Sequence, residues 1–370
     1  MLRIFLATIF FAVVFSACSE DESTDATNDD NFDRKAMLVN YADNIIIPFY
    51  NNFEVSMRSL SGAVDQFIET SDLTTLAKLQ EEYKNTYHSW QQVAMFQIGK
   101  AEEIAFLNFM NSYPVNVDNL VKNIENGQYD LSAISQQDEQ GFPALDYLVF
   151  GVGINNEEII DFYINNTSAI AYKEYLKDVI GRMSDMTGLV VSDWNNSFRD
   201  TFVNNSGSSK TSSFNKLVND YIFYYEKHLR AGKVGIPAGV FSKDPLSDKV
   251  EAYYAADISK SLFTENLKML RDFFNGEGTS TANGIGMSAY LKFLNIAKEE
   301  EELDDLVNGQ FETIENVAES LNENFTTQIK NDNTSMLSLY DELQKNVILL
   351  KVDVLQALSI SVDYVDADGD

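Results

Sequence analysis

Apolar residues recur at steps of three and four along several long stretches of this chain, a spacing that places them on one face of a helix. The clearest stretches are 71–94, 172–198, 214–229 and 336–358. Strand-like alternation is rare, and only five prolines are present. The sequence therefore predicts an all-α fold. We expect Ser71 and Asn333 to cap the first and last of these helices, and Pro48 to kink or interrupt an earlier one.

The length of the chain indicates more than one domain. At 370 residues it exceeds most single small cores and suggests two domains. The best internal break is the segment 204–213, which has no apolar residue and is rich in Gly and Ser. It separates 33–203 from 214–366, and each part holds enough long helical patterns for a helical bundle. We therefore expect two helical-bundle domains.

The N-terminal residues have the features of a bacterial lipoprotein signal peptide. Arg3 precedes an apolar run over 4–15 that is too short to span a bilayer stably. Small residues then lead to Cys18, the only cysteine of the chain, in a pattern that resembles a lipobox. We predict that residues 1–17 are removed and that a lipid on Cys18 anchors the protein to the outer membrane.

The residues behind this anchor predict a flexible tether. Segment 18–32 is polar, acidic and poor in apolar residues, so it cannot bury a core. Its first acids, in 19–22, resemble a signal that accompanies export to the cell surface in some bacterial groups. The sequence leaves open whether the protein faces the periplasm or the cell exterior.

Charge and residue counts exclude several classes of function. The net charge of −30 repels nucleic acid, so we expect no DNA or RNA partner. A single cysteine excludes a disulfide within the chain and a cysteine-based zinc site. The two histidines, His88 and His228, lie too far apart for a His-Glu-x-x-His protease helix. We interpret His88 as a residue at the edge of a core. For His228 we also favour a structural role, with pairing to Glu226 or a place near the cleft as the alternatives.

The run GFPALDYLVFG at 141–151 carries the strongest functional signal. It resembles the signature of the imelysin family, Gly-x-His-x-x-Glu followed by an apolar run and Gly. Gly141 and Gly151 frame the motif here, but Pro143 stands at the His position and Asp146 at the Glu position. Pro143 can neither ligate a metal nor move a proton, and we expect it in a first helical turn. Asp146 can serve either as a hard oxygen ligand or as a hydrogen-bond acceptor for nearby backbone.

Other segments resemble the same family in the expected order, so that the resemblance covers most of 35–370. They are Trp90 with the apolar run behind it, Ser112-Tyr113-Pro114, 227–240, 251–274, 284–291 and 350–370. The resemblance implies a two-domain helical protein with a cleft between the domains near the motif. It further implies that Glu251, Tyr253 and Ser259 could complete a polar site with Asp146 in that cleft.

The resemblance implies either of two activities, because the family includes a peptidase and many iron-associated envelope proteins. The degenerate motif favours a non-catalytic component that binds iron, or another divalent or trivalent cation, and works with iron-uptake components. We predict no catalytic residue. An imelysin-type metallopeptidase and a surface module that binds a peptide or glycan are the alternatives, and the enzyme requires more metal ligands than the motif now offers.

Overall fold

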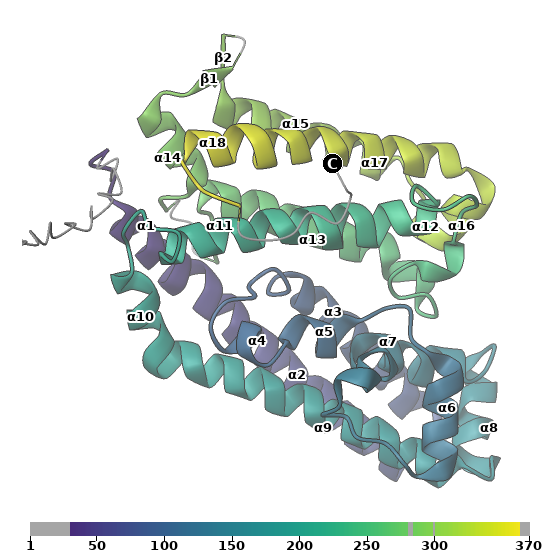
Figure 1. Cartoon of the computed structure of the whole chain (residues 1–370). Helices are drawn as coiled ribbons and strands as arrows, with labels where there is room; N and C mark the ends of the chain where they lie inside the picture. Colours follow the sequence, from purple (N-terminus) through teal and green to yellow (C-terminus); the bar gives the residue numbers. More distant parts are fainter. Residues whose placement is uncertain (1–29, 280–283, 299, 363–370) are drawn as a thin grey trace, which may run out of the picture.

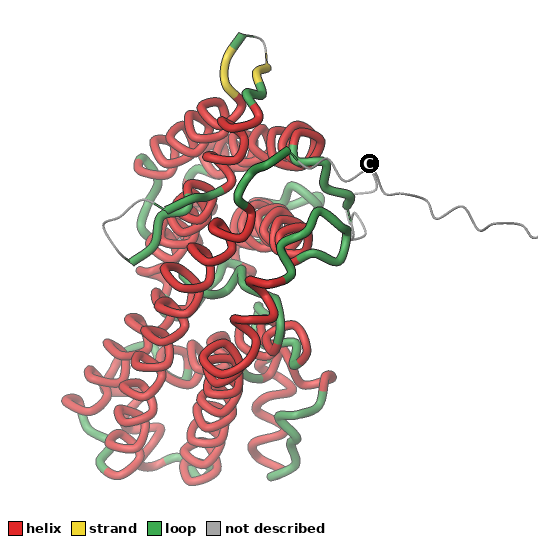
Figure 2. Tube along the Cα trace, turned by 90° about the vertical axis from the view of Figure 1, so that its left-hand side faces the viewer, coloured by secondary structure: helices red, strands yellow, loops and turns green. Residues whose placement is uncertain are grey.

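The computed structural model describes residues 30–279, 284–298 and 300–362, and it consists of two stacked helical bundles (Figures 1 and 2). The chain is 74% helical, which confirms the predicted all-α class. In the described ranges the strands are β1 (Ala297–Lys298) and β2 (Glu301–Glu302), which pair as a short antiparallel hairpin. None of the helices in these ranges is long and apolar enough to cross a membrane.

The first bundle is built around α2, which packs against both α3 and α9. Its elements are α2 (Ile47–Glu69), α3 (Leu73–Gln91), α4 (Lys100–Glu103), α5 (Phe106–Asn111), α6 (Val117–Asn126), η2 (Ile134–Glu139), α7 (Gly141–Asp146), η3 (Tyr147–Gly151), α8 (Asn156–Asn165) and α9 (Ala169–Asp193). The predicted apolar face of α3 is buried as expected. Fully burying one large apolar side chain contributes roughly 1.5–3 kcal/mol, so such faces account for the packing.

The second bundle packs α17 against α15 and against the π-helical η5. Its elements are α11 (Ser213–Tyr224), η5 (Tyr225–Gly235), α12 (Ile236–Ala238), η6 (Ser247–Lys249), η7 (Ala256–Ile258), α13 (Ser259–Asn275), α14 (Met287–Leu294), α15 (Leu303–Glu319), α16 (Phe325–Asn331), α17 (Asn333–Ile348), η8 (Leu349–Val354) and α18 (Leu355–Ala357). One helix of this bundle, α13, also packs against α3 of the first bundle.

Two helical segments connect the bundles. After α9 the chain continues through η4 (Trp194–Phe198) and α10 (Arg199–Asn204), and residues 205–212 of the polar segment then form the loop into α11. At the start of the chain, α1 (Arg34–Asn40) and η1 (Tyr41–Ile46) run into α2 as one long helical stretch (Figure 1). The side chain of Asn40 donates hydrogen bonds to backbone oxygens of the second bundle, so this stretch spans both bundles.

Pro48 lies within a continuous helical stretch: the helix type changes from η1 to α2 just before it, and the backbone stays helical there. Pro48 occupies the first turn of α2, directly after the π-helical η1. Proline has no N–H, so it cannot bond the carbonyl of Asn44 one turn earlier. That carbonyl oxygen instead accepts the backbone N–H of Thr279 at 3.2 Å. The hydrogen bond that Pro48 cannot make therefore leaves an acceptor for a segment of the second bundle.

The two predicted N-caps are wrong by one residue. Asp72 caps α3, accepting the N–H groups of Thr74 and Thr75, whereas the Ser71 hydroxyl donates to a carbonyl at the end of α2. In the same way Asp332, and not Asn333, accepts an N–H at the start of α17. In both pairs a carboxylate lies next to the expected cap, and its charge is favoured at the positive end of the helix.

Cys18 and the signal peptide 1–17 lie outside the described residues, as does most of the tether 18–32. Lipidation, the outer-membrane anchor and the choice between the periplasmic and the exterior face stay predictions.

Candidate functional site

The motif forms a short helix, α7, that only glycine can start in this setting. Gly141 has φ +72°, and a Cβ atom built there would lie 2.3 Å from the backbone oxygen of Met110 in α5. This close packing sets α7 against α5 and places Pro143 in the first helical turn, as predicted. The missing N–H of Pro143 is therefore one that the helix start leaves unpaired in any case. One turn later α7 ends at Asp146.

Asp146 is buried, with 3% of its surface exposed, and both carboxylate oxygens are engaged by backbone. One oxygen accepts the N–H of Tyr254 at 2.8 Å, and the other accepts the N–H of Ala255 at 2.8 Å. Burial raises the pKa of the carboxyl to about 7, although the two N–H bonds lower it. Of the two roles that the sequence allowed, the structure shows the backbone acceptor. The backbone in question is more than a hundred residues away and leads into the second bundle.

A pocket of about 170 Å³ lies over Asp146 at the boundary between the bundles. Turn residues after α5, the start of α7 and the segment before α13 line it: Tyr113, Pro114, Val115, Pro143, Asp146, Asp248, Lys249, Val250, Ala252, Tyr253 and Tyr254. The lining contains three phenols and two carboxylates but no serine, threonine, cysteine or histidine. This composition provides hard oxygen donors and lacks the hydroxyl, thiol and imidazole side chains of the Ser-His and Cys-His hydrolases.

The tyrosines of the pocket are held to different degrees. The ring of Tyr254 packs edge-on against Tyr147. A Cβ atom at Gly151 would lie 2.6 Å from the ring of Tyr254. Gly151 of the motif frame therefore makes room for Tyr254. Tyr253 is 37% exposed. Burial raises the pKa of Tyr254 to about 12 and holds that of Tyr113 well above its ordinary value.

Glu251 lies behind the pocket in a buried polar network that joins the two bundles. It forms an ion pair with Lys233 of η5, and both side chains are less than 5% exposed. From the first bundle, Asn111 donates to Glu251 at 2.8 Å and Gln91 donates at 3.3 Å. Gln91 also accepts from Lys233 at 2.9 Å. The hydroxyl of Tyr87 completes the network by donating to Asn111 at 2.7 Å.

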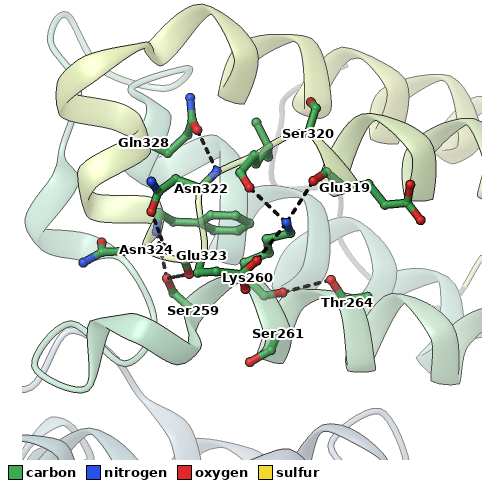
Figure 3. A network of polar contacts seen from close by, with 12 residues as sticks. Ser259, Lys260, Ser261, Thr264, Glu319, Ser320, Asn322, Glu323, Asn324 and Gln328 are labelled. Carbon is green, nitrogen blue, oxygen red and sulfur yellow. Dashed lines mark hydrogen bonds and ion pairs between the residues drawn. The ribbon is translucent and has the colours of Figure 1, made fainter.

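Ser259 is not part of this pocket. It starts α13, and its hydroxyl oxygen accepts the buried N–H of Phe325 at 2.8 Å (Figure 3). The neighbouring Lys260 donates to the carbonyl oxygens of Glu319 and Leu321 and pairs with Glu323 (Figure 3). Ser259 and Lys260 thus hold the turn between α15 and α16. The structure brings Asp146, Pro143 and Tyr253 together, whereas Ser259 is buried against the segment between α15 and α16.

The two histidines lie apart from the pocket lining. Nε2 of His88 is 3.2 Å from the Ser261 hydroxyl, at the contact of α3 with α13. The ring of His228 stacks on Tyr224, and burial lowers its pKa to about 4. Burial also lowers the pKa of His88. Both environments agree with histidines at the edge of a core and disfavour the protonated form.

Sequence reasoning missed the partners of Glu251. Lys233 falls among the small residues of KHLRAGKVG, where nothing distinguishes it from a surface lysine. Gln91 and Asn111 sit at the ends of α3 and α5, and neither residue type signals burial. Tyr113 lay in a segment that the sequence did single out, but without an assigned role. Of these residues, only Tyr113 could have been found from the sequence, through the resemblance of its segment to the family.

The residues at the motif do not fit a resident metal ion. No group of three or more His, Cys, Asp or Glu side chains is placed to hold one anywhere in the described ranges. Both oxygens of Asp146 already accept N–H groups, and Glu251 is neutralised by Lys233. A catalytic zinc usually has three protein ligands, and the pocket lining supplies no histidine or cysteine.

The fold and the pocket define a class: a two-bundle helical protein with a small site at the bundle boundary, beside a Gly-x-x-x-x-acid helix start. The sequence model of imelysin matches residues 46–350, and the chain belongs to the imelysin family. The comparison with curated proteins gives no match.

The fold is similar to that of solved structures, two of which align with most of this chain. A Parabacteroides distasonis protein described as an iron-regulated protein A precursor aligns with a TM-score of 0.72 at 17% identity, covering 88% of this chain and 95% of that one. An imelysin-like protein from Psychrobacter arcticum aligns with a TM-score of 0.68 at 15% identity, covering 90% of this chain and 97% of that one. Identities this low establish a common fold only.

Proposed function

We propose that this protein is a non-catalytic, lipid-anchored binding component of the cell envelope that serves iron acquisition, with ferric iron as its cargo in the pocket at the bundle boundary. The observation that carries the proposal is the pocket lining. It combines three tyrosines and Asp248 with the occupied carboxylate of Asp146, and it offers no serine, cysteine or histidine for hydrolysis.

The size of the pocket and the state of Asp146 favour iron that arrives as a small chelate. A ferric ion prefers hard oxygen donors, and a chelate brings most of them itself. The pocket, at about 170 Å³, has room for a few such atoms and is too small for a large macrocycle. The neighbour from Parabacteroides is described as iron-regulated, which supports a role in the same process.

The experiment uses residues 19–370, without the predicted signal peptide and lipidated Cys18, and ferric nitrilotriacetate as the probe. A phenolate that binds ferric iron gives a visible charge-transfer band, which we would titrate for the wild type, Tyr253→Phe and Tyr147→Phe. Tyr253 lines the pocket and is partly exposed, whereas Tyr147 packs behind Tyr254 and lies outside the lining. We expect stoichiometric binding that Tyr253→Phe weakens roughly tenfold or more and that Tyr147→Phe leaves unchanged.

Absence of the band and of bound iron would refute the proposal, as would equal binding by all three proteins. The competing metallopeptidase is tested in parallel with unfolded casein. Cleavage that is abolished both by chelator and by Asp146→Asn would establish the enzyme instead. If neither iron binding nor cleavage is found, a peptide or glycan ligand becomes the reading to pursue.

A further inference from the structure

The segment Val250–Ala255 crosses the boundary between the bundles, and we refer to it as the strap. It precedes α13 of the second bundle, yet its polar contacts are made largely with the first bundle. Four of its six residues line the pocket: Val250, Ala252, Tyr253 and Tyr254. The position of the strap therefore determines the shape of the pocket.

Two buried carboxylates hold the strap: one belongs to the first bundle and bonds the strap, and the other belongs to the strap and bonds the first bundle. Asp146 reaches from the first bundle and accepts the backbone N–H groups of Tyr254 and Ala255. Glu251 reaches from the strap into the first bundle, where Asn111 and Gln91 donate to it, and it is neutralised by Lys233. Each carboxylate is about 3% exposed. A buried carboxylate that accepts several N–H bonds is well satisfied, and removing its donors leaves a costly group.

The residue between the two anchors shows that the strap is tightly constrained. Ala252 adopts φ +56°, in the left-handed region that residues other than glycine rarely occupy. This conformation occurs between Glu251, which is buried, and Tyr253, which is 37% exposed. Such a backbone conformation persists only where the surrounding contacts over-determine it. The anchors on either side of Ala252 supply those contacts.

We propose that Asp146, at the position of the motif's metal-capable acid, is a positioning residue: it fixes the strap, and through it Tyr253 and the pocket, and it ligates no metal. This inference rests on the proposed function only for the identity of the cargo. In this proposal the acid of the degenerate motif holds the strap in place by accepting its backbone N–H groups.

Lys249 provides a reporter of the strap, because trypsin cleaves the bond between Lys249 and Val250 and Val250 is 2% exposed. We therefore expect cleavage there to require opening of the strap. Lys243, in the exposed loop six residues earlier, serves as an internal reference site. We would compare cleavage at both lysines by mass spectrometry in residues 19–370 under native conditions. Proteolysis of a locally opened segment follows the population of the open form.

Three variants separate positioning from metal ligation. Asp146→Asn replaces one acceptor by an NH₂ group that faces an N–H donor. Ala255→Pro deletes one donor and leaves the carboxylate intact, and Ala255 already has φ −84°, close to the proline value. Asp193→Asn is the matched control, because Asp193 of α9 also accepts a backbone N–H from another element, that of Lys100 at 3.2 Å, and does not line the pocket.

We expect cleavage at Lys249 to become roughly tenfold faster or more in Asp146→Asn and in Ala255→Pro, with Lys243 unchanged and Asp193→Asn resembling the wild type. Zinc, calcium and ferrous chlorides should leave the melting temperature of the wild type unchanged. Ala255→Pro keeps the test decisive if Asp146→Asn does not fold. Unaltered protection of Lys249 in Ala255→Pro would overturn the proposal, and so would a metal-dependent stabilisation that Asp146→Asn abolishes.

The outcomes for the strap and for the cargo are distinguishable. If the wild type does not bind ferric nitrilotriacetate but Asp146→Asn increases cleavage at Lys249, the proposed function is refuted and the positioning role of Asp146 is supported. Iron binding that Asp146→Asn abolishes while Lys249 stays protected would support the function and refute the positioning role.

Discussion

Replacing Lys233 by methionine should destabilise the protein far more than removing any surface charge. Lys233 and Glu251 form an ion pair with side chains 4% and 3% exposed. Without the ammonium group, Glu251 keeps only the amide donors of Asn111 and Gln91. Breaking a buried pair from one side leaves a buried charge uncompensated and costs about 3–5 kcal/mol. For domains of this size that corresponds to a fall in melting temperature of roughly 10 °C.

The matched control is Lys84→Met. Lys84 of α3 pairs with Asp257 of the second bundle, so this ion pair also joins the bundles, but its side chains are 31% and 68% exposed. An exposed pair contributes about 0–1 kcal/mol, because water screens it. The two substitutions remove the same charge from the same boundary and differ in burial.

The assay is urea unfolding at pH 7.5 followed by tryptophan fluorescence. Trp90 and Trp194 are fully buried, so they report loss of packing. The double variant Lys233→Met, Glu251→Gln should be less destabilised than the sum of its two single variants, by about 2 kcal/mol, because neither charge is then left alone. A loss of under about 1 kcal/mol in Lys233→Met, or an equal loss in Lys84→Met, would refute the reasoning.

Three further predictions follow from single sites. Gly141→Ala should lower the free energy of unfolding by more than about 3 kcal/mol, because the new Cβ would overlap a backbone carbonyl at a residue with positive φ. The control Gly62→Ala, in the middle of α2 with open space around it, should raise that free energy by up to about 1 kcal/mol, as compared by thermal unfolding. Ser259→Ala should lose about 1–3 kcal/mol through an unpaired buried N–H and leave ferric nitrilotriacetate binding unchanged; weakened binding at full stability would return Ser259 to the site. Burial lowers the pKa of His228 to about 4, so between pH 6.5 and pH 4 the unfolded chain binds a proton that the folded chain does not. Because Asp146 also titrates in this window, the prediction is a difference between two proteins: from pH 7 to pH 4.5 the change in stability measured by urea unfolding should be less favourable in the wild type than in His228→Gln by up to about 3 kcal/mol.

Periodicity predicted the helices well because it reports a local property. The stretches 71–94 and 336–358 both proved to be long helices with the expected apolar faces buried. Helix ends were less predictable, since a cap is decided between neighbours of similar type, as at Ser71 and Asp72. The position of Pro143 in a first turn followed from the chemistry of proline alone.

The site was predictable only in its parts. The motif pointed to Asp146, and the resemblance pointed to Tyr253, and the two do line one pocket. Neither the pattern nor the resemblance could show that both oxygens of Asp146 are occupied by backbone N–H groups from another bundle. Glu251 was singled out as a residue looking into the cleft and is instead a buried partner of Lys233.

By itself, the sequence determined the helical class, the membership suggested by the 141–151 motif and the loss of the motif's histidine, because these depend on local spacing and on residue type. Only the tertiary structure decided what the remaining acid does. A carboxylate can bind a cation, a lysine or a pair of amides, and the choice depends on which donors the fold brings within 3 Å. Those donors lie more than a hundred residues along the chain, where no local pattern reaches.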